Sequence, residues 1–273
     1  MIAEPLPLVD LERRFGGLRR LYGDAGYARI RAARVAVVGL GGVGSWACEA
    51  LARSGVATLT LIDLDHVAES NINRQVQAIG ATLGQAKALA LRDRIADIHP
   101  GCTVFAVEEF VDEFNWPGVL PQPVDVLIDA CDQVRAKLAL AAWALQTGTP
   151  LVAVGAAGGK RRPQDVQVDD LARVTHDPLL GSLRQRLRKR LGAARDTGLG
   201  VRCVFSREAV AAPAQACNPG DGDDDKAAND GSLNCHGYGS TVGVTATFGM
   251  VAANEALEFL VDGSGQTPRQ SPI

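Results

Sequence analysis

The stretch "VAVVGLGGVGSWACEALARSG", residues 35–55, decides the fold of this chain. A short apolar run enters a cluster of glycines, and small and apolar residues follow at helical spacing up to Gly55, so the stretch predicts a strand, a tight turn and a helix. Gly39, Gly41 and Gly44 fit the G-x-G-x-x-G spacing, in which the backbone approaches a phosphate at a helix N-terminus. The motif predicts a nucleotide site but does not decide between NAD, FAD and ATP.

The sequence that follows alternates between predicted strands and helices. Four apolar runs are typical of buried strands, and two amphipathic segments between them are typical of helices. The strands are "TLTLIDLD" (58–65), "CTVFAVE" (102–108), "VDVLIDA" (124–130) and "PLVAVG" (150–155), and the helices are "GQAKALALRDRIADIHP" (84–100) and "RAKLALAAWALQTG" (135–148). This order predicts an α/β fold, a Rossmann-like and mostly parallel sheet with helices on both faces and an elaborated C-terminal part.

We expect a single domain over residues 1–273, with the nucleotide-binding core at about 30–160 and the C-terminal elaboration at about 161–262. The elaboration has a predicted strand at 165–170, a basic helix at 178–196 and a last helix at about 243–261. The last helix is weakly apolar, but Asn254, Glu255 and Glu258 interrupt it, so we predict a packed helix and no membrane span.

The composition sets few limits on function. The 273 residues are 47% apolar with a formal net charge of −3, so any contact with nucleic acid must use a local basic patch. Six cysteines without a C-x-x-C pair, behind an N-terminus that lacks a signal-peptide layout, predict a reduced, cytoplasmic protein.

Residues after the second strand favour ATP over NAD. Asp63 ends that strand about 20 residues beyond the glycines, where an acid accepts hydrogen bonds from a ribose. Adenylation directs a carboxylate at the α-phosphate of ATP, so it needs cations on the phosphates and an anchor for Mg²⁺. Arg74 and Lys87 can supply the cations and Asp132 the anchor, whereas NAD keeps its phosphates intact and has no use for this set.

Each of these three residues has a simpler explanation when taken alone. Asp132 could be a helix N-cap, Arg74 a member of a surface ion pair, and Lys87 a solvated helix residue. Because all three follow strand ends on one rim of the predicted sheet, together they favour chemistry at a phosphate.

The segments "GLGGVGSW", "SNINRQ" (70–75) and "DACDQ" (129–133) resemble the ATP-binding core of the ubiquitin-activating-like (ThiF-like) superfamily. That superfamily includes the bacterial molybdopterin and thiamine sulfur-carrier adenylyltransferases. The resemblance implies ATP and Mg²⁺ as cofactors, with Asp63 on the ribose, Arg74 and Lys87 on the phosphates, Asp132 on Mg²⁺ and Asn71 in the active site. The nucleotide-binding residues that it implies are Gly39, Gly41, Gly42, Gly44, Ser45, Asp63, Asp65, Asn73 and Gln75.

The superfamily also completes each site with an arginine from the partner's N-terminal helix. In this chain the matching region is "RRFGGLRRLYG" (13–23), where Arg14 and Arg20 are both candidates. The resemblance therefore implies a homodimer.

The second half of the chain resembles one group of the superfamily, the tRNA threonylcarbamoyladenosine dehydratases. The matching stretches include "GAAGGK" (155–160), "DVQVDDLARVTHDPL" (165–179), "CVFSREA" (203–209) and "GVTATFGMVAANEAL" (243–257). The group implies ATP-dependent cyclisation of threonylcarbamoyladenosine on a tRNA through a carboxyl-adenylate. It leaves open a monovalent cation near the C-terminal loops and a cysteine-desulfurase or sulfur-acceptor partner.

Two alternative functions stay open at this point. One is adenylation of the C-terminus of a sulfur-carrier protein; the carrier adenylyltransferases use two C-x-x-C pairs for a structural zinc, and this chain has none, so we expect no zinc. The other is an NAD(P)-binding redox or sensor protein, which would bind NAD and show no ATP–pyrophosphate exchange.

Further candidates are a cysteine and a basic run. Cys235, in "LNCHGYG", matches a cysteine of the dehydratase group. It could form a thioester during the reaction or have no covalent role, and we favour the second alternative. Cys48 and Cys131 fall in core-forming segments and are expected to be packing residues. The basic run "SLRQRLRKRLGAARD" is either a solvated helix face or a surface that docks tRNA. The candidates for contact with tRNA are Arg186, Arg188, Lys189 and Arg190.

Overall fold

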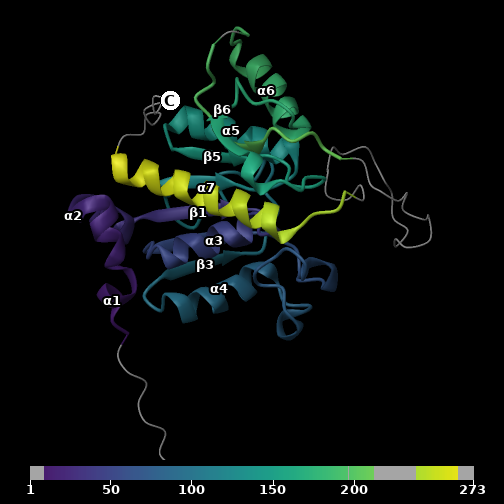
Figure 1. Ribbon diagram of the computed structural model, residues 1–273. Coiled ribbons are helices and arrows are strands. Elements are labelled where there is room, and N and C mark those ends of the chain that lie inside the picture. The colour runs from purple at the N-terminus through teal and green to yellow at the C-terminus, as the bar shows by residue number, and fades with distance from the viewer. Residues whose placement is uncertain (1–8, 196, 212–237, 264–273) are drawn as a thin grey trace, which may run out of the picture.

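The computed structural model describes residues 9–195, 197–211 and 238–263 (Figure 1). Within them, seven strands form one sheet in the order β3-β2-β1-β4-β5-β7-β6. The strands are β1 (Arg34–Val38), β2 (Thr58–Ile62), β3 (Thr103–Val107), β4 (Val126–Asp129), β5 (Leu151–Val154), β6 (Val166–Asp170) and β7 (Arg202–Ser206). All neighbours are parallel except β6 and β7, so the predicted α/β fold with a mostly parallel sheet is confirmed.

Helices cover both faces of the sheet (Figure 1). Successive strand residues point to opposite faces, so Val35 and Val37 of β1 pack in one core and Ala36 and Val38 in the other. Helices α2, α3, α4 and α7 close the first core, and α5 and α6 close the second. The helices are α1 (Leu11–Phe15), α2 (Gly17–Ala32), α3 (Gly44–Arg53), α4 (Lys87–Ile98), α5 (Val134–Thr147), α6 (Pro178–Leu191) and α7 (Val242–Asp262), with short 3-10 turns at Glu69–Asn71, Gly80–Thr82 and Pro163–Asp165.

Helix α7 explains the long apolar run near the C-terminus. Among the residues that the structure describes, it is the one helix long and apolar enough to cross a membrane by length and composition. It packs against α3, and Gly249 lets the two helices approach because a Cβ there would lie 2.5 Å from the carbonyl oxygen of Val43. Its side chains Val244, Phe248 and Ala252 are buried in the first core, as the prediction of a packed helix requires.

The basic helix α6 is shorter than the sequence suggested. It ends at Leu191 because Gly192 adopts the left-handed conformation, with φ 63°, and terminates the helix. Arg195 of the basic run therefore lies beyond the helix.

The strand order predicts where a ligand would bind on the sheet. The chain leaves β1 toward β2 on one side and returns with β4 on the other, so the turns that follow β1 and β4 diverge above the sheet. In doubly wound sheets, ligands bind outside the C-terminal ends of the strands at this reversal. The glycine turn follows β1, and the segment that contains Asp132 follows β4, so both lie at the reversal.

Candidate nucleotide-binding site

A cavity of about 320 Å³ opens at the C-terminal ends of β1, β2, β4 and β5. That volume is within the range of small-molecule sites. Ten of the residues predicted from the sequence line it, namely Gly39, Gly41, Gly42, Asp63, Asp65, Asn71, Arg74, Gln75, Lys87 and Asp132. The fold thus brings together segments that are separated by as much as 90 residues of chain.

The glycine turn has a separate reason for each glycine. Gly39 has φ +84°, and a Cβ there would lie 2.8 Å from the backbone of Ala130, so only glycine fits between β1 and the loop after β4. A Cβ on Gly44 would lie 1.8 Å from the carbonyl oxygen of Gly39, which makes this glycine a requirement of the turn. Gly41 instead lines the cavity, and its nearest heavy atom would be Gln75 Nε2 at 4.0 Å.

The carboxylate of Asp63 is oriented by the backbone of the turn. Its Oδ2 accepts the Leu40 amide at 2.6 Å, and its Oδ1 accepts the Asp65 amide at 2.8 Å. Burial raises the pKa of Asp63, and the charge of Lys87 together with the two amides offsets only part of that increase. A carboxylate fixed in this way at the end of β2 is suited to accept ribose hydroxyls.

The two predicted cations both line the cavity. Lys87 Nζ lies 2.7 Å from Asp65 Oδ2, and the lysine side chain is only 8% exposed while that of Asp65 is 56% exposed. Arg74 Nη1 donates to the carbonyl of Ser70 at 2.7 Å and to Asn73 Oδ1 at 2.9 Å, and both partners are uncharged. Lys87 is therefore not a solvated helix residue, and the contacts of Arg74 are not those of a surface ion pair.

Asp132 and Cys131 follow β4 at the cavity wall. The N-cap of α5 is Gln133 rather than Asp132, so the simpler explanation for Asp132 does not hold. Cys131 packs against the second core, as predicted, and it also lines the cavity, where its Sγ donates to Asp129 Oδ1 at 2.9 Å. Burial and the neighbouring Asp129 carboxylate raise the pKa of Cys131 well above its usual value, so the thiol stays protonated. Cys48 is buried in the first core, as predicted.

Three predicted residues do not line the cavity but support residues around it. Gly44 belongs to the turn itself, and Ser45 is fully buried, with its Oγ 3.4 Å from the amide of Val76. Asn73 holds Arg74 and donates from Nδ2 to the carbonyl of Ser240 at 3.1 Å. Asn71 both lines the cavity and caps its own turn, since its Oδ1 accepts the Ala68 amide at 3.1 Å.

Sequence reasoning missed part of the cavity wall. Glu109, Phe110 and Val111 come from the segment after β3 and the range 155–158 from the loop after β5, while Ser240 precedes α7 and Thr245 lies in its first turn. The first two segments follow strand ends, so the strand-end rule applied to every predicted strand would have found them. No local signal identifies Ser240 or Thr245, because only the packing of α7 across the sheet brings them to the cavity.

The arginines of the N-terminal helices lie far from this cavity in their own chain. Arg14 Nη1 donates to the carbonyls of Asp97 at 2.9 Å and Ile98 at 2.6 Å, where α4 ends. Helix α2, which carries the exposed Arg20, meets the C-terminal end of α7, whereas the N-terminal end of α7 lines the cavity (Figure 1). About 16 residues of helix, or roughly 24 Å, separate these two ends.

The remaining candidates are the basic residues predicted to contact tRNA and Cys235. Arg186, Lys189 and Arg190 are exposed on α6, whereas Arg188 is half-buried and donates to the carbonyls of Ala194 and Thr197. Arg188 is therefore used within the chain, which separates it from the other three. Cys235 lies outside the described residues.

The fold and the cavity define a class of protein: a doubly wound α/β protein whose cavity, at the reversal of strand order, is lined by a glycine turn, an arginine, a lysine and an aspartate. The chain belongs to the ThiF family, whose model matches residues 16–271.

Several proteins that are similar over most of the chain share one name. The tRNA threonylcarbamoyladenosine dehydratase of Escherichia coli (strain K12) is 43% identical over 254 residues, 90% of this chain and 92% of that protein. The Haemophilus influenzae protein of the same name is 36% identical over 257 residues, 92% of this chain and 95% of that protein. Among solved structures, the E. coli dehydratase TcdA in complex with ATP has a TM-score of 0.81 at 40% identity, covering 92% of this chain and 95% of that one.

Proposed function

We propose that this protein uses ATP to dehydrate N6-threonylcarbamoyladenosine on tRNA to its cyclic form through a carboxyl-adenylate. The observation that carries the proposal is that Arg74, Lys87 and Asp132 line one cavity together with the glycine turn. The similarity to the dehydratases supports the choice of substrate, because it extends over nine-tenths of the chain rather than over the nucleotide-binding core alone.

The cavity residues would divide the recognition of ATP among themselves. Asp63 accepts the ribose hydroxyls, and the open face of Gly41 admits the phosphates to the N-terminus of α3. Arg74 and Lys87 hold the phosphates. In this arrangement Lys87 exchanges its bond to the exposed Asp65 carboxylate for one to a phosphate oxygen.

The residues present fit Mg²⁺. Asp132 supplies a hard oxygen ligand at the cavity wall, and no cluster of three or more His, Cys, Asp or Glu side chains suited to a metal occurs among the described residues. Mg²⁺ is usually held by one or two carboxylates together with substrate phosphates, and such a site needs no larger protein cluster. When bound, Mg²⁺ neutralises the charge that develops on the leaving pyrophosphate.

The reaction then proceeds in two steps. The free carboxylate of the threonylcarbamoyl group attacks the α-phosphorus of ATP, and pyrophosphate leaves. The ureido part of the same group attacks the activated carbonyl, a ring closes, and AMP departs with net loss of one water. The attacking atom is already tethered to the electrophile, so proximity supplies much of the acceleration and no protein nucleophile is needed.

Cys235 therefore has no covalent role in the proposed reaction. We expect Cys235→Ala to keep most of the cyclisation activity, measured on the same tRNA as the wild type. A loss as deep as that of Asp132→Ala would contradict this expectation and restore the thioester alternative.

The protein acts as a homodimer in the cytoplasm. The distance between α2 and the cavity of its own chain supports the dimer, because an arginine of the N-terminal helices can reach a cavity only from a second copy. Arg20 is the better candidate, since Arg14 is engaged at the end of α4. The exposed cations of α6, whose residue Leu179 lines the cavity, offer a surface for tRNA phosphates.

One assay tests the proposal. Purified protein, ATP, Mg²⁺ and tRNA carrying the linear modification are incubated, and the nucleosides are analysed by mass spectrometry. We expect an ATP-dependent loss of one water from the modified adenosine, abolished in Asp132→Ala. Pyrophosphate exchange that depends on a sulfur-carrier protein and not on tRNA would instead favour the carrier adenylyltransferase, and NAD binding without any exchange would favour the redox or sensor protein.

A further inference from the structure

Beneath the cavity lies a fully buried ion pair that does not line it. Lys137, in the first turn of α5, and Asp129, the last residue of β4, are both 0% exposed. Lys137 Nζ lies 3.1 Å from Asp129 Oδ2. Burial acts to lower the pKa of Lys137, but the Asp129 carboxylate together with the other polar groups around the ammonium outweighs burial and raises that pKa.

Lys137 connects the ends of two strands. Its Nζ donates to the carbonyl of Val154, the last residue of β5, at 2.7 Å, and lies 3.3 Å from the carbonyl of Asp129. The two loops that start at these strand ends form one wall of the cavity: residues 130–133 after β4 and residues 155–158 after β5. A single ammonium group thus fixes the spacing between the origins of both loops.

Each of the two loops is also anchored by a buried carboxylate. Asp129 Oδ1 lies 3.2 Å from the Cys131 amide, which donates to it, and Cys131 precedes Asp132. Asp177 Oδ2 accepts the Ala156 amide at 2.9 Å, while its Oδ1 caps α6 by accepting the Leu180 amide. The Asp129 carboxylate therefore contacts Lys137 on one side and the backbone beside Asp132 on the other.

We propose that Lys137, paired with Asp129, is a positioning residue that aims Asp132 at the phosphates and Mg²⁺ of bound ATP. This inference rests on the proposed function. Buried ion pairs can often be replaced by uncharged groups of similar size without loss of stability, so we expect the pair to matter more for geometry than for stability. What such a replacement removes is the fixed geometry of the loop, and that geometry is what Asp132 needs in order to act.

The test uses the double variant Asp129→Asn/Lys137→Met in the full chain. It removes both charges together, and the asparagine keeps one oxygen for the Cys131 amide. Asp129→Asn/Lys137→Gln, which also removes both charges but keeps an N–H donor for the Val154 carbonyl, serves as a second variant in case the first does not fold. Three readouts are taken: amide hydrogen exchange of residues 130–133, the Mg²⁺ dependence of ATP binding, and the rate of cyclisation.

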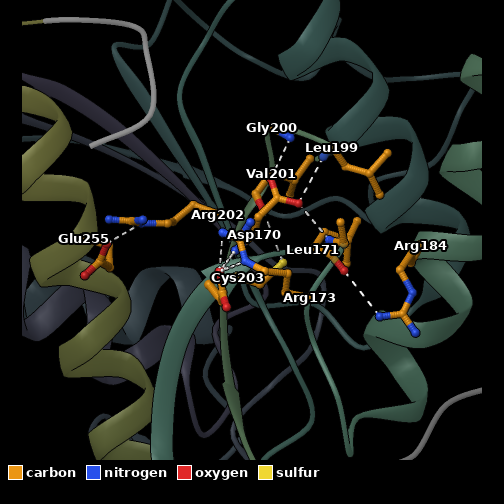
Figure 2. Close-up of polar contacts among 12 residues, drawn as sticks. Asp170, Leu171, Arg173, Arg184, Leu199, Gly200, Val201, Arg202, Cys203 and Glu255 are labelled. Atoms are coloured by element: carbon orange, nitrogen blue, oxygen red, sulfur yellow. Dashed lines mark hydrogen bonds and ion pairs between the residues drawn. The ribbon is translucent and has the colours of Figure 1, made fainter. Parts of the chain in front are cut away.

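A matched control removes a shielded ion pair at the opposite edge of the sheet. Arg202 Nε lies 2.6 Å from Glu255 Oε2, and Figure 2 shows Arg202 reaching from β7 to α7. Arg202 is the first residue of a strand parallel to β5, so it lies at the N-terminal edge, away from the cavity. The control variant is Arg202→Met/Glu255→Gln.

The inference predicts a specific pattern of results. Relative to wild type, the 129/137 variant exchanges residues 130–133 at least tenfold faster, needs at least threefold more Mg²⁺ for half-maximal ATP binding, and loses at least tenfold in kcat with KM for tRNA nearly unchanged. The control keeps all of these values. A folded variant whose loop exchange and Mg²⁺ dependence match the wild type would overturn the inference. A wild-type protein that binds ATP but does not cyclise tRNA would contradict the proposed function, and the first two readouts would still decide the role of Lys137.

Discussion

Replacing Lys87 with methionine separates catalysis from stability. The Lys87 side chain is 8% exposed and its stem is packed at the start of α4, so methionine preserves most of the buried volume while removing the charge. The ion pair lost with it has a partner, Asp65, that is 56% exposed. Such a pair contributes less than about 1 kcal/mol, which for a chain of this size corresponds to a change in Tm of less than about 4 °C.

The effect on the reaction should be much larger. Removing one preorganised group that stabilises developing charge in a water-poor site typically lowers kcat by roughly 10²- to 10³-fold, or about 3 to 4 kcal/mol. We therefore expect Lys87→Met to fold normally and to cyclise tRNA at least about a hundredfold more slowly. Single-turnover cyclisation and thermal unfolding are measured on the same preparation.

The same substitution should change the pH dependence of ATP binding. Burial raises the pKa of Asp63, and the charge of Lys87 counteracts part of this rise. Without Lys87 the pKa of Asp63 rises further, so on acidification the variant loses the ionised ribose acceptor at a higher pH than the wild type does. Arg92→Met, on the exposed side of the same helix, is the control. A Lys87→Met protein that cyclises within threefold of wild type, with an unchanged pH profile, would refute this reasoning.

Three further predictions concern the turn, the basic helix and the acid side of the stability profile. Gly41→Ala should leave Tm unchanged but weaken ATP binding measured by calorimetry, whereas Gly44→Ala should lower stability by more than about 2 kcal/mol in urea unfolding, because its Cβ would clash with a carbonyl at 1.8 Å. Replacing Arg186 and Lys189 with glutamate should weaken tRNA binding and reduce the slope of log K against log salt by about 2; an unchanged slope would exclude α6 from docking. Burial and the charge of Arg31 lower the pKa of His99 from 6.5 to about 4 in the folded protein. Between pH 6.5 and about 4, the imidazole is therefore protonated more readily in the unfolded chain than in the folded one, so the free energy of unfolding falls as the pH drops through this range. The unfolding midpoint of His99→Leu should decrease less steeply with falling pH than that of the wild type. An equally steep decrease would contradict this role of His99.

The sequence predicted the sheet because its strands are buried on both faces. Such strands appear as nearly continuous apolar runs that end in polar residues, and those ends mark the rim of the sheet where Asp63 and Asp132 lie. Gly39 and Gly44 were also readable, since the positive φ of one and the close approach of the other exclude most other residues. Local chemistry was sufficient for these positions.

Long-range packing decided what local chemistry could not. No pattern near Thr245 indicates that α7 crosses the sheet and brings this residue to the cavity. Likewise, Arg186 and Arg188 are the same residue type on the same helix, yet only the folded structure shows that Arg188 donates to the carbonyls of Ala194 and Thr197 while Arg186 stays exposed.

By itself, then, the sequence determined the first five strands of the sheet, the glycine turn and residues that line the cavity beside it, because backbone sterics, burial and strand ends are local properties; β7 was not predicted. The tertiary structure alone decided that Lys137, eight residues beyond Asp129, joins the ends of β4 and β5. The physical reason is that a buried charge is tolerated only where its partners converge, and convergence between strands far apart in the chain exists only in the folded protein.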